Sequence, residues 1–332
     1  IKKFGSKCVQ AEDEIAAMGV ALGASFAGDL TVCATSGPGM CLKSEFIGLA
    51  SITELPLIIC NVQRGGPSTG LPTKTEQSDL LQALFSRHGD CPIPVIAAHS
   101  PSDCFDCAIE AVRIALTYMT PVILLSDLYV ANGAEPWRVP NVSDIPVIEN
   151  SFAKIEEEYV IYRRDPKTLA RTQAIPGQVG LEHRIGGLEK GEDGGVSYDP
   201  DNHEEMSHLR AQKVAGIAKS LDPIEIQGEP EGDLLVIGWG GTYGAISSAA
   251  TNLRDEGFSV SNIHLRHLNP LSDDLGDIIG RFKKVIVPEL NLGQLNLLLR
   301  AKYLVDVISY GKLQGKPFKV SELHEKFLEH LR

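Results

Sequence analysis

The apolar residues of this chain fall into two alternating patterns. Short, almost uninterrupted apolar runs at residues 30–35, 55–60 and 121–127 predict strands that are buried on both faces of a parallel sheet. Between these runs, apolar residues recur every three or four positions, which is typical of helices that cover a sheet. Strand, turn and helix follow one another in this way up to about residue 133. The pattern therefore predicts a doubly wound α/β unit.

The first helix of this unit is expected over residues 12–28. Its predicted apolar stripe consists of Ile15, Met18, Leu22 and Phe26. Three acids occupy its first turn: Glu12, Asp13 and Glu14. On a helical wheel Asp13 faces away from the stripe, whereas Glu12 and Glu14 flank it. These carboxylates could simply favour the positive end of the helix, or a half-buried one could exchange a proton with a ligand.

The alternation stops at residues 134–228, which are rich in Pro, Gly and charged residues. Only residues 208–221 of this stretch have a convincing helical pattern, so we interpret it as an irregular connector. A second α/β unit is expected over residues 229–332, with strands at 234–239, 258–265, 283–290 and 305–310. The predicted fold class is α/β, with two doubly wound parallel-sheet units (1–133 and 229–332) joined by the connector (134–228).

Composition excludes several classes of partner. The 332 residues carry a net charge of −12, from 31 basic and 43 acidic residues, which disfavours nucleic acid and anionic membranes. No apolar run approaches the roughly 20 residues needed to cross a bilayer. The first residues also lack the apolar segment of a signal peptide. We therefore expect a cytoplasmic protein.

The seven cysteines all lie in the first third of the chain. Their odd number, and the position of several within apolar runs, indicate buried thiols in a reducing compartment. Cys104 and Cys107 form a single CxxC pair without further cysteines at ligand spacing. We therefore predict no metal ion and no iron–sulfur cluster in this chain.

The most distinctive stretch is residues 61–79, NVQRGGPSTGLPTKTEQSD. It follows the predicted strand 55–60 and so leaves the carboxyl end of that strand, where open α/β sheets bind ligands. Its glycines allow close approach of a ligand, and it carries two cations, Arg64 and Lys74, beside several hydroxyls, including Ser68 and Thr73. Such a loop suits a small carboxylate held by Arg64. A surface loop with solvated charges remains the alternative.

A glycine turn, GWGGTYG at residues 238–244, follows the first predicted strand of the second unit. It differs from a dinucleotide-binding fingerprint because Tyr243 stands where the third glycine is needed. Arg266 and His267 stand where an acid would bind the ribose. We therefore favour a turn that serves close packing over a nicotinamide site.

Five segments together resemble the alpha subunit of 2-oxoacid:ferredoxin oxidoreductases, in particular the 2-oxoglutarate type: AEDEIAAMGVALGASFAG, ATSGPGM, QRGGPSTGLPTKTEQSDL, GWGGTYG and PELNLGQL. The resemblance implies a domain that binds the pyrimidine of thiamine diphosphate, followed by a transketolase C-terminal-like domain. It also implies the reaction. A 2-oxoacid loses CO₂, electrons pass through iron–sulfur clusters to ferredoxin, and coenzyme A takes the acyl group.

The resemblance also assigns residues. Glu14 matches the glutamate that hydrogen-bonds the pyrimidine ring, because Gly19, Gly23 and Gly28 follow it at the family's spacing; Glu12 is the second choice. Arg64 matches the arginine that holds the 2-oxoacid carboxylate, and Thr73 matches a hydroxyl on the same substrate. Ser68 and Lys74 are weaker candidates for substrate binding.

The family's Tyr-Pro-Ile-Thr-Pro segment and its Gly-Asp-Gly motif for diphosphate and Mg²⁺ have no counterpart here. The nearest match to that motif, residues 191–195, lies in the connector. We therefore expect an N-terminally incomplete chain that works only with a beta subunit, which carries Mg²⁺ and the iron–sulfur clusters. Pyruvate or a branched-chain 2-oxoacid is an alternative substrate. A transketolase-like enzyme and a non-catalytic binding or assembly subunit are alternative functions.

Overall fold

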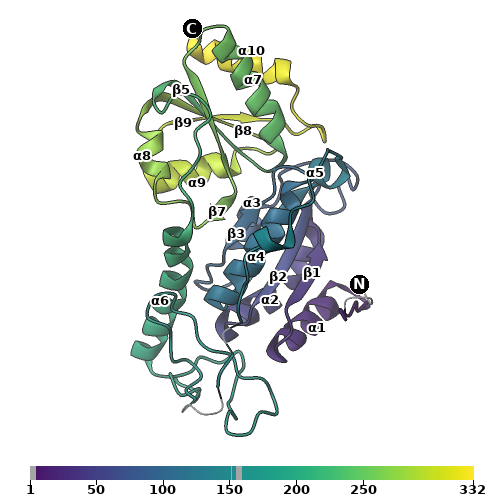
Figure 1. Cartoon of the computed structure of the whole chain (residues 1–332), viewed down its shortest axis with the longest axis vertical. Helices are drawn as coiled ribbons and strands as arrows, with labels where there is room; N and C mark the ends of the chain where they lie inside the picture. The colour runs from purple at the N-terminus through teal and green to yellow at the C-terminus, as the bar shows by residue number, and fades with distance from the viewer. Residues whose placement is uncertain (1–4, 151, 155–158) are drawn as a thin grey trace.

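The computed structural model describes residues 5–150, 152–154 and 159–332, and it contains two β-sheets (Figure 1). The first has the strand order β1-β2-β4-β3-β7, and the second has the order β6-β5-β8-β9. The strands of the first sheet are β1 (Thr31–Thr35), β2 (Leu57–Gln63), β3 (Val95–Ala97), β4 (Pro121–Asp127) and β7 (His267–Asn269). Those of the second sheet are β5 (Gly232–Trp239), β6 (Val260–Leu265), β8 (Phe282–Glu289) and β9 (Val307–Gly311).

The helices follow the strands as the hydrophobic pattern predicts. In the first half these are α1 (Glu14–Phe26), α2 (Gly37–Thr53), α3 (Leu80–Phe85), α4 (Asp103–Tyr118) and α5 (Leu128–Asn132). In the second half they are α6 (Pro200–Gly216), α7 (Tyr243–Asp255), α8 (Leu275–Ile279), α9 (Gln294–Tyr303) and α10 (Val320–Leu331). None of the described helices is long and apolar enough to cross a membrane.

Alternate residues of the inner strand β2 serve opposite faces of the first sheet. Leu57 and Ile59 pack against α1 and α2, whereas Ile58 packs against α4. The strand is parallel to both neighbours, so that Leu57 stands opposite Thr31 of β1 and Pro121 of β4. Burial on both faces explains the uninterrupted apolar run in the sequence.

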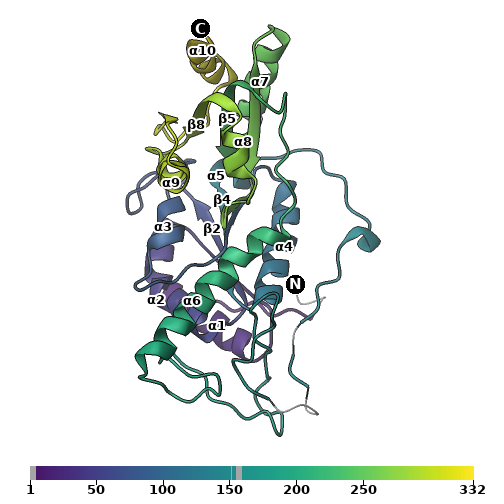
Figure 2. The ribbon, with the colours of Figure 1, turned by 90° about the vertical axis from the view of Figure 1, so that its left-hand side faces the viewer.

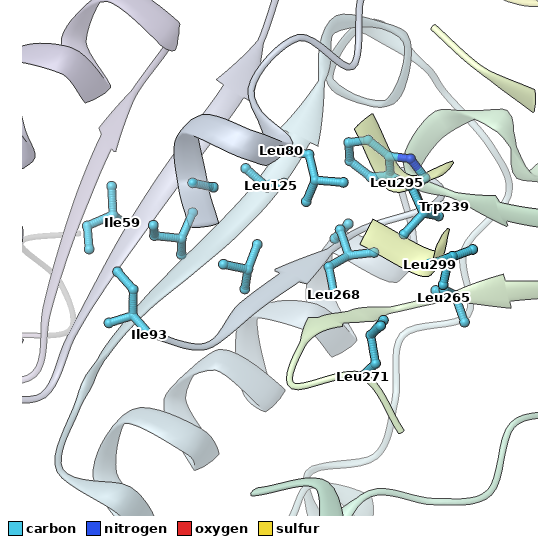
Figure 3. Close-up of a cluster of buried hydrophobic side chains, with 14 of the residues drawn as sticks. Ile59, Leu80, Ile93, Leu125, Trp239, Leu265, Leu268, Leu271, Leu295 and Leu299 are labelled. Carbon is cyan, nitrogen blue, oxygen red and sulfur yellow. The ribbon is translucent and has the colours of Figure 1, made fainter. Parts of the chain in front are cut away.

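The second sheet is parallel throughout and shares its core with the first. Helices α7 and α10 cover one face. The other face packs α8 and α9 and continues into the core of the first sheet, as Figure 3 shows for Leu80 and Leu125 beside Trp239 and Leu295. The two sheets are therefore held together by a single apolar cluster, and the α/β fold class is confirmed.

Strand β7 is the main departure from the predicted topology. It lies in the second half of the chain, yet it pairs antiparallel with β3 at the edge of the first sheet, where His267 stands opposite Ile96. Its three residues are too few to show an alternating pattern, so the sequence offers no signal for it. The domain boundaries at residues 133 and 228 stay a prediction.

The connector is more helical than the sequence predicted. Helix α6 begins at Pro200, eight residues before the expected start, and a 3₁₀ turn at residues 217–220 follows it. The carboxylate of Asp199 caps the helix by accepting from the backbone N–H groups of Asp201 and Asn202. Figure 2 shows α6 running along the first unit rather than between the two. The sequence did contain a signal for this earlier start, because the capping residue Asp199 is followed by Pro200, and proline is common at the first position of a helix.

The connector is fastened to the first unit by buried charges, although its sequence had suggested little chemistry. The carboxylate of Glu54, at the end of α2, is fully buried and receives Arg164 at 2.6 Å and Lys213 at 2.5 Å. Burial alone would raise the pKa of Glu54, but Lys213 and Arg164 override it and lower this pKa to about 2. Arg171 adds hydrogen bonds to the carbonyl of Thr53.

Candidate functional site

Glu14 is the first residue of α1, and its side chain is exposed. The helix begins two residues later than predicted because Asp13 caps it, accepting a hydrogen bond from the backbone N–H of Ala16 at 2.8 Å. Glu12 lies before the cap and is also exposed. Ile15 is 44% exposed, so it does not belong to the buried stripe predicted for this helix. The first turn of α1 therefore presents its carboxylates at the surface rather than half-buried.

The Glu14 side chain lies against the first turn of α2. A Cβ atom placed on Gly39 would lie 2.8 Å from Cγ of Glu14 and 2.0 Å from the hydroxyl oxygen of Thr35. Only glycine fits at this position, because both neighbours would collide with any side chain. The last glycine of the motif SGPG, which opens α2, is therefore needed for packing, because it allows the end of β1 and the start of α1 to come together beside it.

Arg64 leaves the end of β2, which extends three residues further than the predicted strand. Its guanidinium Nε is buried and has no hydrogen-bond partner among the described residues. Its backbone carbonyl accepts from the hydroxyl of Ser78 at 2.9 Å, which ties the two ends of the loop together. An arginine held in this way has donor capacity left for an anion.

Asp79 lies beside Arg64 and faces the same turn of α2. A Cβ atom on Gly37 would lie 3.0 Å from both carboxylate oxygens of Asp79. Burial raises the pKa of Asp79, although the hydrogen bonds from Ser78 and Asn61 and the charge of Arg64 oppose this rise. The turn at residues 36–39 is thus flanked by Glu14 on one side and by Asp79 on the other.

The tip of the loop is exposed and is closed by its own backbone. The N–H of Gly65 donates to the carbonyl of Lys74 at 3.0 Å, and the N–H of Leu71 donates to the carbonyl of Gly65 at 2.8 Å. Ser68 sits at the tip with a φ of 53°, and Ser68, Thr73 and Lys74 are all exposed. None of these three side chains has a recorded contact with Glu14 or Arg64. The described structure therefore brings Glu14 to the turn of α2, places Arg64 at the base of the loop and leaves Ser68, Thr73 and Lys74 on the loop surface.

The rear of the loop is joined to the second sheet through Gln77, which is fully buried. Its side-chain amide donates to the carbonyl of Trp239 at 2.7 Å and accepts from the N–H of Leu290 at 2.9 Å. Its backbone N–H donates to the carbonyl of Leu290 at 3.0 Å, and its carbonyl accepts from Asn291 at 2.9 Å. Gln77 therefore fastens the rear of the loop to the second unit.

Asp127, at the end of β4, fills the glycine turn of the second unit. It accepts from the hydroxyl of Thr75 at 3.0 Å and from the N–H of Gly241 at 2.9 Å. A Cβ atom on Gly241 would lie 2.6 Å from this carboxylate. The glycine turn therefore packs closely against Asp127, which agrees with its interpretation as a packing turn.

Sequence reasoning missed Gln77 and Asp127 as organisers of the site. Gln77 lies in the distinctive loop and Asp127 at the end of a predicted strand, but their partners in the second unit lie more than a hundred residues away. A cavity of about 790 Å³ between α3, α6, β7 and α9 contains none of the predicted site residues. The candidate site is an open edge of the chain, not an enclosed pocket.

Comparison with known proteins identifies relatives over the whole described fold. The family model of the pyruvate flavodoxin/ferredoxin oxidoreductase, thiamine diphosphate-binding, matches residues 1–195. The chain is 54% identical to the 2-oxoglutarate oxidoreductase subunit KorA of Mycobacterium tuberculosis, over 97% of this chain and 49% of that protein. It is 35% identical to the 2-oxoglutarate synthase subunit KorA of Archaeoglobus fulgidus, over 89% of this chain and 78% of that one.

Two solved structures share the fold. The 2-oxoglutarate:ferredoxin oxidoreductase from Magnetococcus marinus, solved with 2-oxoglutarate, coenzyme A and succinyl-CoA bound, superimposes with a TM-score of 0.94 at 37% identity. It covers 100% of this chain and 58% of the solved chain. A split-gene transketolase gives a TM-score of 0.52 at 13% identity over 96% of this chain and 81% of that chain, which reflects the fold alone. The chain spans about half the length of the mycobacterial relative.

Proposed function

The chain belongs to the pyruvate flavodoxin/ferredoxin oxidoreductase family of thiamine diphosphate-binding proteins, and we propose that it is the alpha-type subunit of a 2-oxoglutarate:ferredoxin oxidoreductase. The enzyme would convert 2-oxoglutarate and coenzyme A into succinyl-CoA and CO₂, or run in reverse, with ferredoxin exchanging the electrons. The observation that carries this proposal is the glycine turn of α2, which lies between Glu14 and Asp79, the last residue of the loop that carries Arg64. The names of the relatives supply the choice of 2-oxoglutarate.

The residues around Glu14 fit the aminopyrimidine ring of thiamine diphosphate. An exposed carboxylate stands at the start of α1, and glycine in place of a side chain at position 39 leaves backbone at its flank. Glu14 would accept a hydrogen bond from a ring nitrogen and hold the ring in the tautomer that the reaction needs. The cofactor, when bound, supplies the nucleophile that allows a 2-oxoacid to lose CO₂.

Arg64 would hold the carboxylate of the 2-oxoacid. The side chain is partly exposed and its Nε has no partner among the described residues, so the guanidinium is not committed to another group of the chain. A guanidinium can grip both oxygens of a carboxylate and so fix the direction of the keto carbon. Thr73 would add a hydroxyl to the substrate, and Ser68 and Lys74 are weaker candidates on the same loop.

A beta-type partner subunit would complete the site. The chain carries no match for the diphosphate and Mg²⁺ motif in its α/β units, so these groups and the iron–sulfur clusters would be held by the partner. The exposed position of Glu14 supports a cofactor that is enclosed only when the partner binds. In this arrangement residues 1–133 form the pyrimidine-binding domain, and residues 229–332 form the transketolase C-terminal-like domain behind the substrate loop.

The proposal is tested by reconstituting the chain anaerobically with its beta-type partner, thiamine diphosphate, Mg²⁺ and coenzyme A. Reduction of a low-potential viologen is then followed with 2-oxoglutarate and with pyruvate. We expect strong activity with 2-oxoglutarate and little with pyruvate. Activity with pyruvate alone would identify pyruvate as the substrate in place of 2-oxoglutarate. Activity with neither acid would contradict the proposal.

Variants of Arg64 make the same assay specific for the site. Arg64→Ala should raise KM for 2-oxoglutarate by about 10- to 100-fold, the size expected for a lost charged hydrogen bond. Arg64→Lys keeps the charge but loses the two-pronged contact, so its KM should fall between those of the wild type and Arg64→Ala. Arg138→Ala, which changes an exposed arginine of the connector, serves as the control and should leave KM for 2-oxoglutarate unchanged.

A further inference from the structure

A buried glycine lies in an otherwise exposed loop of the second unit. The loop joins β9 to α10, and its residues Leu313, Gln314 and Lys316 are exposed, whereas Gly315 between them is buried. A residue without a side chain is buried in such a loop only if another segment covers its backbone. The φ of Gly315 is 62°, a conformation that glycine adopts more readily than other residues.

The segment that covers Gly315 is the substrate loop, residues 61–79. A Cβ atom on Gly315 would lie 2.8 Å from Cβ of Lys74 and 3.0 Å from Cδ1 of Leu71. The end of a leucine side chain can turn aside, but Cβ of Lys74 moves only if its backbone moves. The backbone of the substrate loop therefore rests directly on Gly315, and the absence of a side chain there allows this contact.

Lys74 and Leu71 belong to the hydrogen-bonded closure of the substrate loop. The N–H of Gly65 donates to the carbonyl of Lys74 at 3.0 Å, and the N–H of Leu71 donates to the carbonyl of Gly65 at 2.8 Å. Arg64 directly precedes Gly65, and Thr73 directly precedes Lys74. The closure therefore joins the backbone neighbours of both residues that we propose to hold the 2-oxoacid.

The loop that carries Gly315 is held in place by its own contacts. Nζ of Lys312 donates to the carbonyl of Pro317 at 2.9 Å and to the carboxylate of Glu322 at 2.6 Å. Phe318 is buried, and its ring lies 5.3 Å from that of Tyr310. A side chain added at Gly315 is therefore expected to displace the substrate loop, whose tip is exposed, rather than its own loop.

We propose that Gly315 is a positioning residue for the substrate. The closure of the substrate loop rests on Gly315, and this contact sets the spacing between Arg64 and Thr73. A guanidinium that holds both oxygens of a carboxylate must be placed within a fraction of an ångström, so a small shift of the closure weakens binding. Binding of the 2-oxoacid thus depends on the contact between the two units. This inference rests on the proposed function for the ligand of Arg64.

The test compares Gly315→Ala with the wild type in the complete complex with the beta-type partner. KM for the 2-oxoacid that the wild type oxidises should rise by about tenfold, because the substrate loop is displaced. The value of kcat should change less, since Glu14 lies on α1 and not on this loop. Gly315→Asn adds the same Cβ atom on a residue that tolerates a positive φ better, and it decides the matter if Gly315→Ala does not fold.

Gly257→Ala is the matched control. Gly257 lies in the same unit and has a φ of 91°, but no described atom lies within 4 Å of the Cβ that alanine would add. Both substitutions force alanine into the left-handed region, so both should lower Tm. Only Gly315→Ala should change KM, because only there does the new atom meet the substrate loop.

A change of side chain at Lys74 makes the test specific for the contact. In a Lys74→Ala background the Cβ atom remains, so adding Gly315→Ala should still raise KM by about tenfold. In a Lys74→Gly background the colliding Cβ is gone, and adding Gly315→Ala should raise KM by less than about twofold. This comparison holds even if Lys74 contacts the substrate, because each double variant is compared with its own single variant.

The two proposals fail in distinguishable ways. If the wild-type complex oxidises neither 2-oxoglutarate nor pyruvate, the proposed function is wrong and this inference falls with it. If the wild type is active and KM stays unchanged in both Gly315→Ala and Gly315→Asn, only the role of Gly315 is wrong. An equal rise of KM in the Lys74→Ala and Lys74→Gly backgrounds, or a rise in Gly257→Ala, also overturns that role.

Discussion

Two clusters of charged residues lie near opposite ends of α2. They differ in how many of their members have a hydrogen-bond or ion-pair partner. At its C-terminal end, Glu54 is enclosed by Arg164 and Lys213 and has no exposed surface. Near its N-terminal end, Glu14 is exposed and, among the described residues, Lys43 has one long hydrogen bond and Nε of Arg64, on the neighbouring loop, has no partner.

The contrast between these clusters separates structure from function. A cluster whose charges are all paired with one another contributes to the stability of this chain. Removing one member leaves the other charges buried and unpaired. A cluster that leaves donors and acceptors open costs stability and gains its compensation from a ligand. The N-terminal end of α2 is therefore where we expect chemistry, and the C-terminal end is where we expect the connector to be held.

The largest expected effect is on catalysis at the open cluster. Glu14→Gln keeps the size of the side chain but removes its charge, and should lower kcat of the reconstituted enzyme by about 100-fold or more, as loss of a proton-transfer partner usually does. The thermal stability of the chain should stay unchanged, because Glu14 is exposed.

Glu12→Gln is the matched control for this comparison, since Glu12 is exposed, lies two residues upstream and precedes the cap of α1. It should retain full activity. If Glu12→Gln abolished turnover and Glu14→Gln did not, Glu12 rather than Glu14 would be the carboxylate that contacts the pyrimidine ring.

The closed cluster should respond in the opposite way. Glu54→Leu leaves the ammonium of Lys213 and the guanidinium of Arg164 buried without an anion, and should destabilise the chain by about 3–5 kcal/mol. Denaturant unfolding measures this loss, and the activity of the protein that remains folded should persist. Glu45→Gln, an exposed glutamate of the same helix, should leave the stability within about 0.5 kcal/mol of the wild type. An equally small change for Glu54→Leu would mean that the cluster does not hold the connector.

The pH dependence of stability should report the same cluster. The pKa of Glu54 is lowered from 4.5 to about 2, so its stabilising contribution is complete above pH 4.5 and is lost as the pH falls toward 2. At roughly 1.4 kcal/mol for each pH unit, the loss is on the order of 3 kcal/mol. Unfolding free energies measured from neutral to acidic pH should fall for the wild type and fall less for Glu54→Leu. Parallel pH curves for the two proteins would contradict this assignment.

A smaller effect is expected where the open cluster meets the second sheet. Gln77→Leu keeps the volume of the side chain but removes its bonds to Trp239 and Leu290, and should cost about 2 kcal/mol of stability. Because the loop is then no longer held against the second sheet, KM for 2-oxoglutarate should rise by about tenfold while kcat changes less. Gln212→Leu, an exposed position on α6, is the control and should change neither quantity. A fall in kcat without a change in KM would show that Gln77 acts on something other than the substrate loop.

Much of this architecture could be predicted from the sequence. The run at 55–60 identified β2 because a strand that is buried on both faces must be apolar at every position. The same reasoning located the turn after it, and hence Arg64, at the carboxyl end of a strand. The resemblance of the motifs to a known family then selected Glu14 among three neighbouring acids. The order of strand, turn and helix is thus written in short stretches of the chain, because each element is formed from residues close in sequence.

Pairings over long distances could not be predicted in this way. Lys213 reaches Glu54 across 159 residues, and Gln77 reaches Trp239 across 162. A lysine in a polar connector and a glutamine in a loop are unremarkable in isolation, so no local pattern marks them. The same holds for β7, whose three residues are assigned to a sheet only by the strand beside it.

The sequence by itself therefore determined the fold class, and it predicted a ligand-binding edge with two residues expected to act there. Only the tertiary structure decided which charges satisfy one another and which are left open, as the contrast between Lys213 and Lys43 shows. The physical reason is that burial and hydrophobic periodicity are local properties of a chain, whereas the compensation of a buried charge depends on whichever distant segment the fold brings beside it.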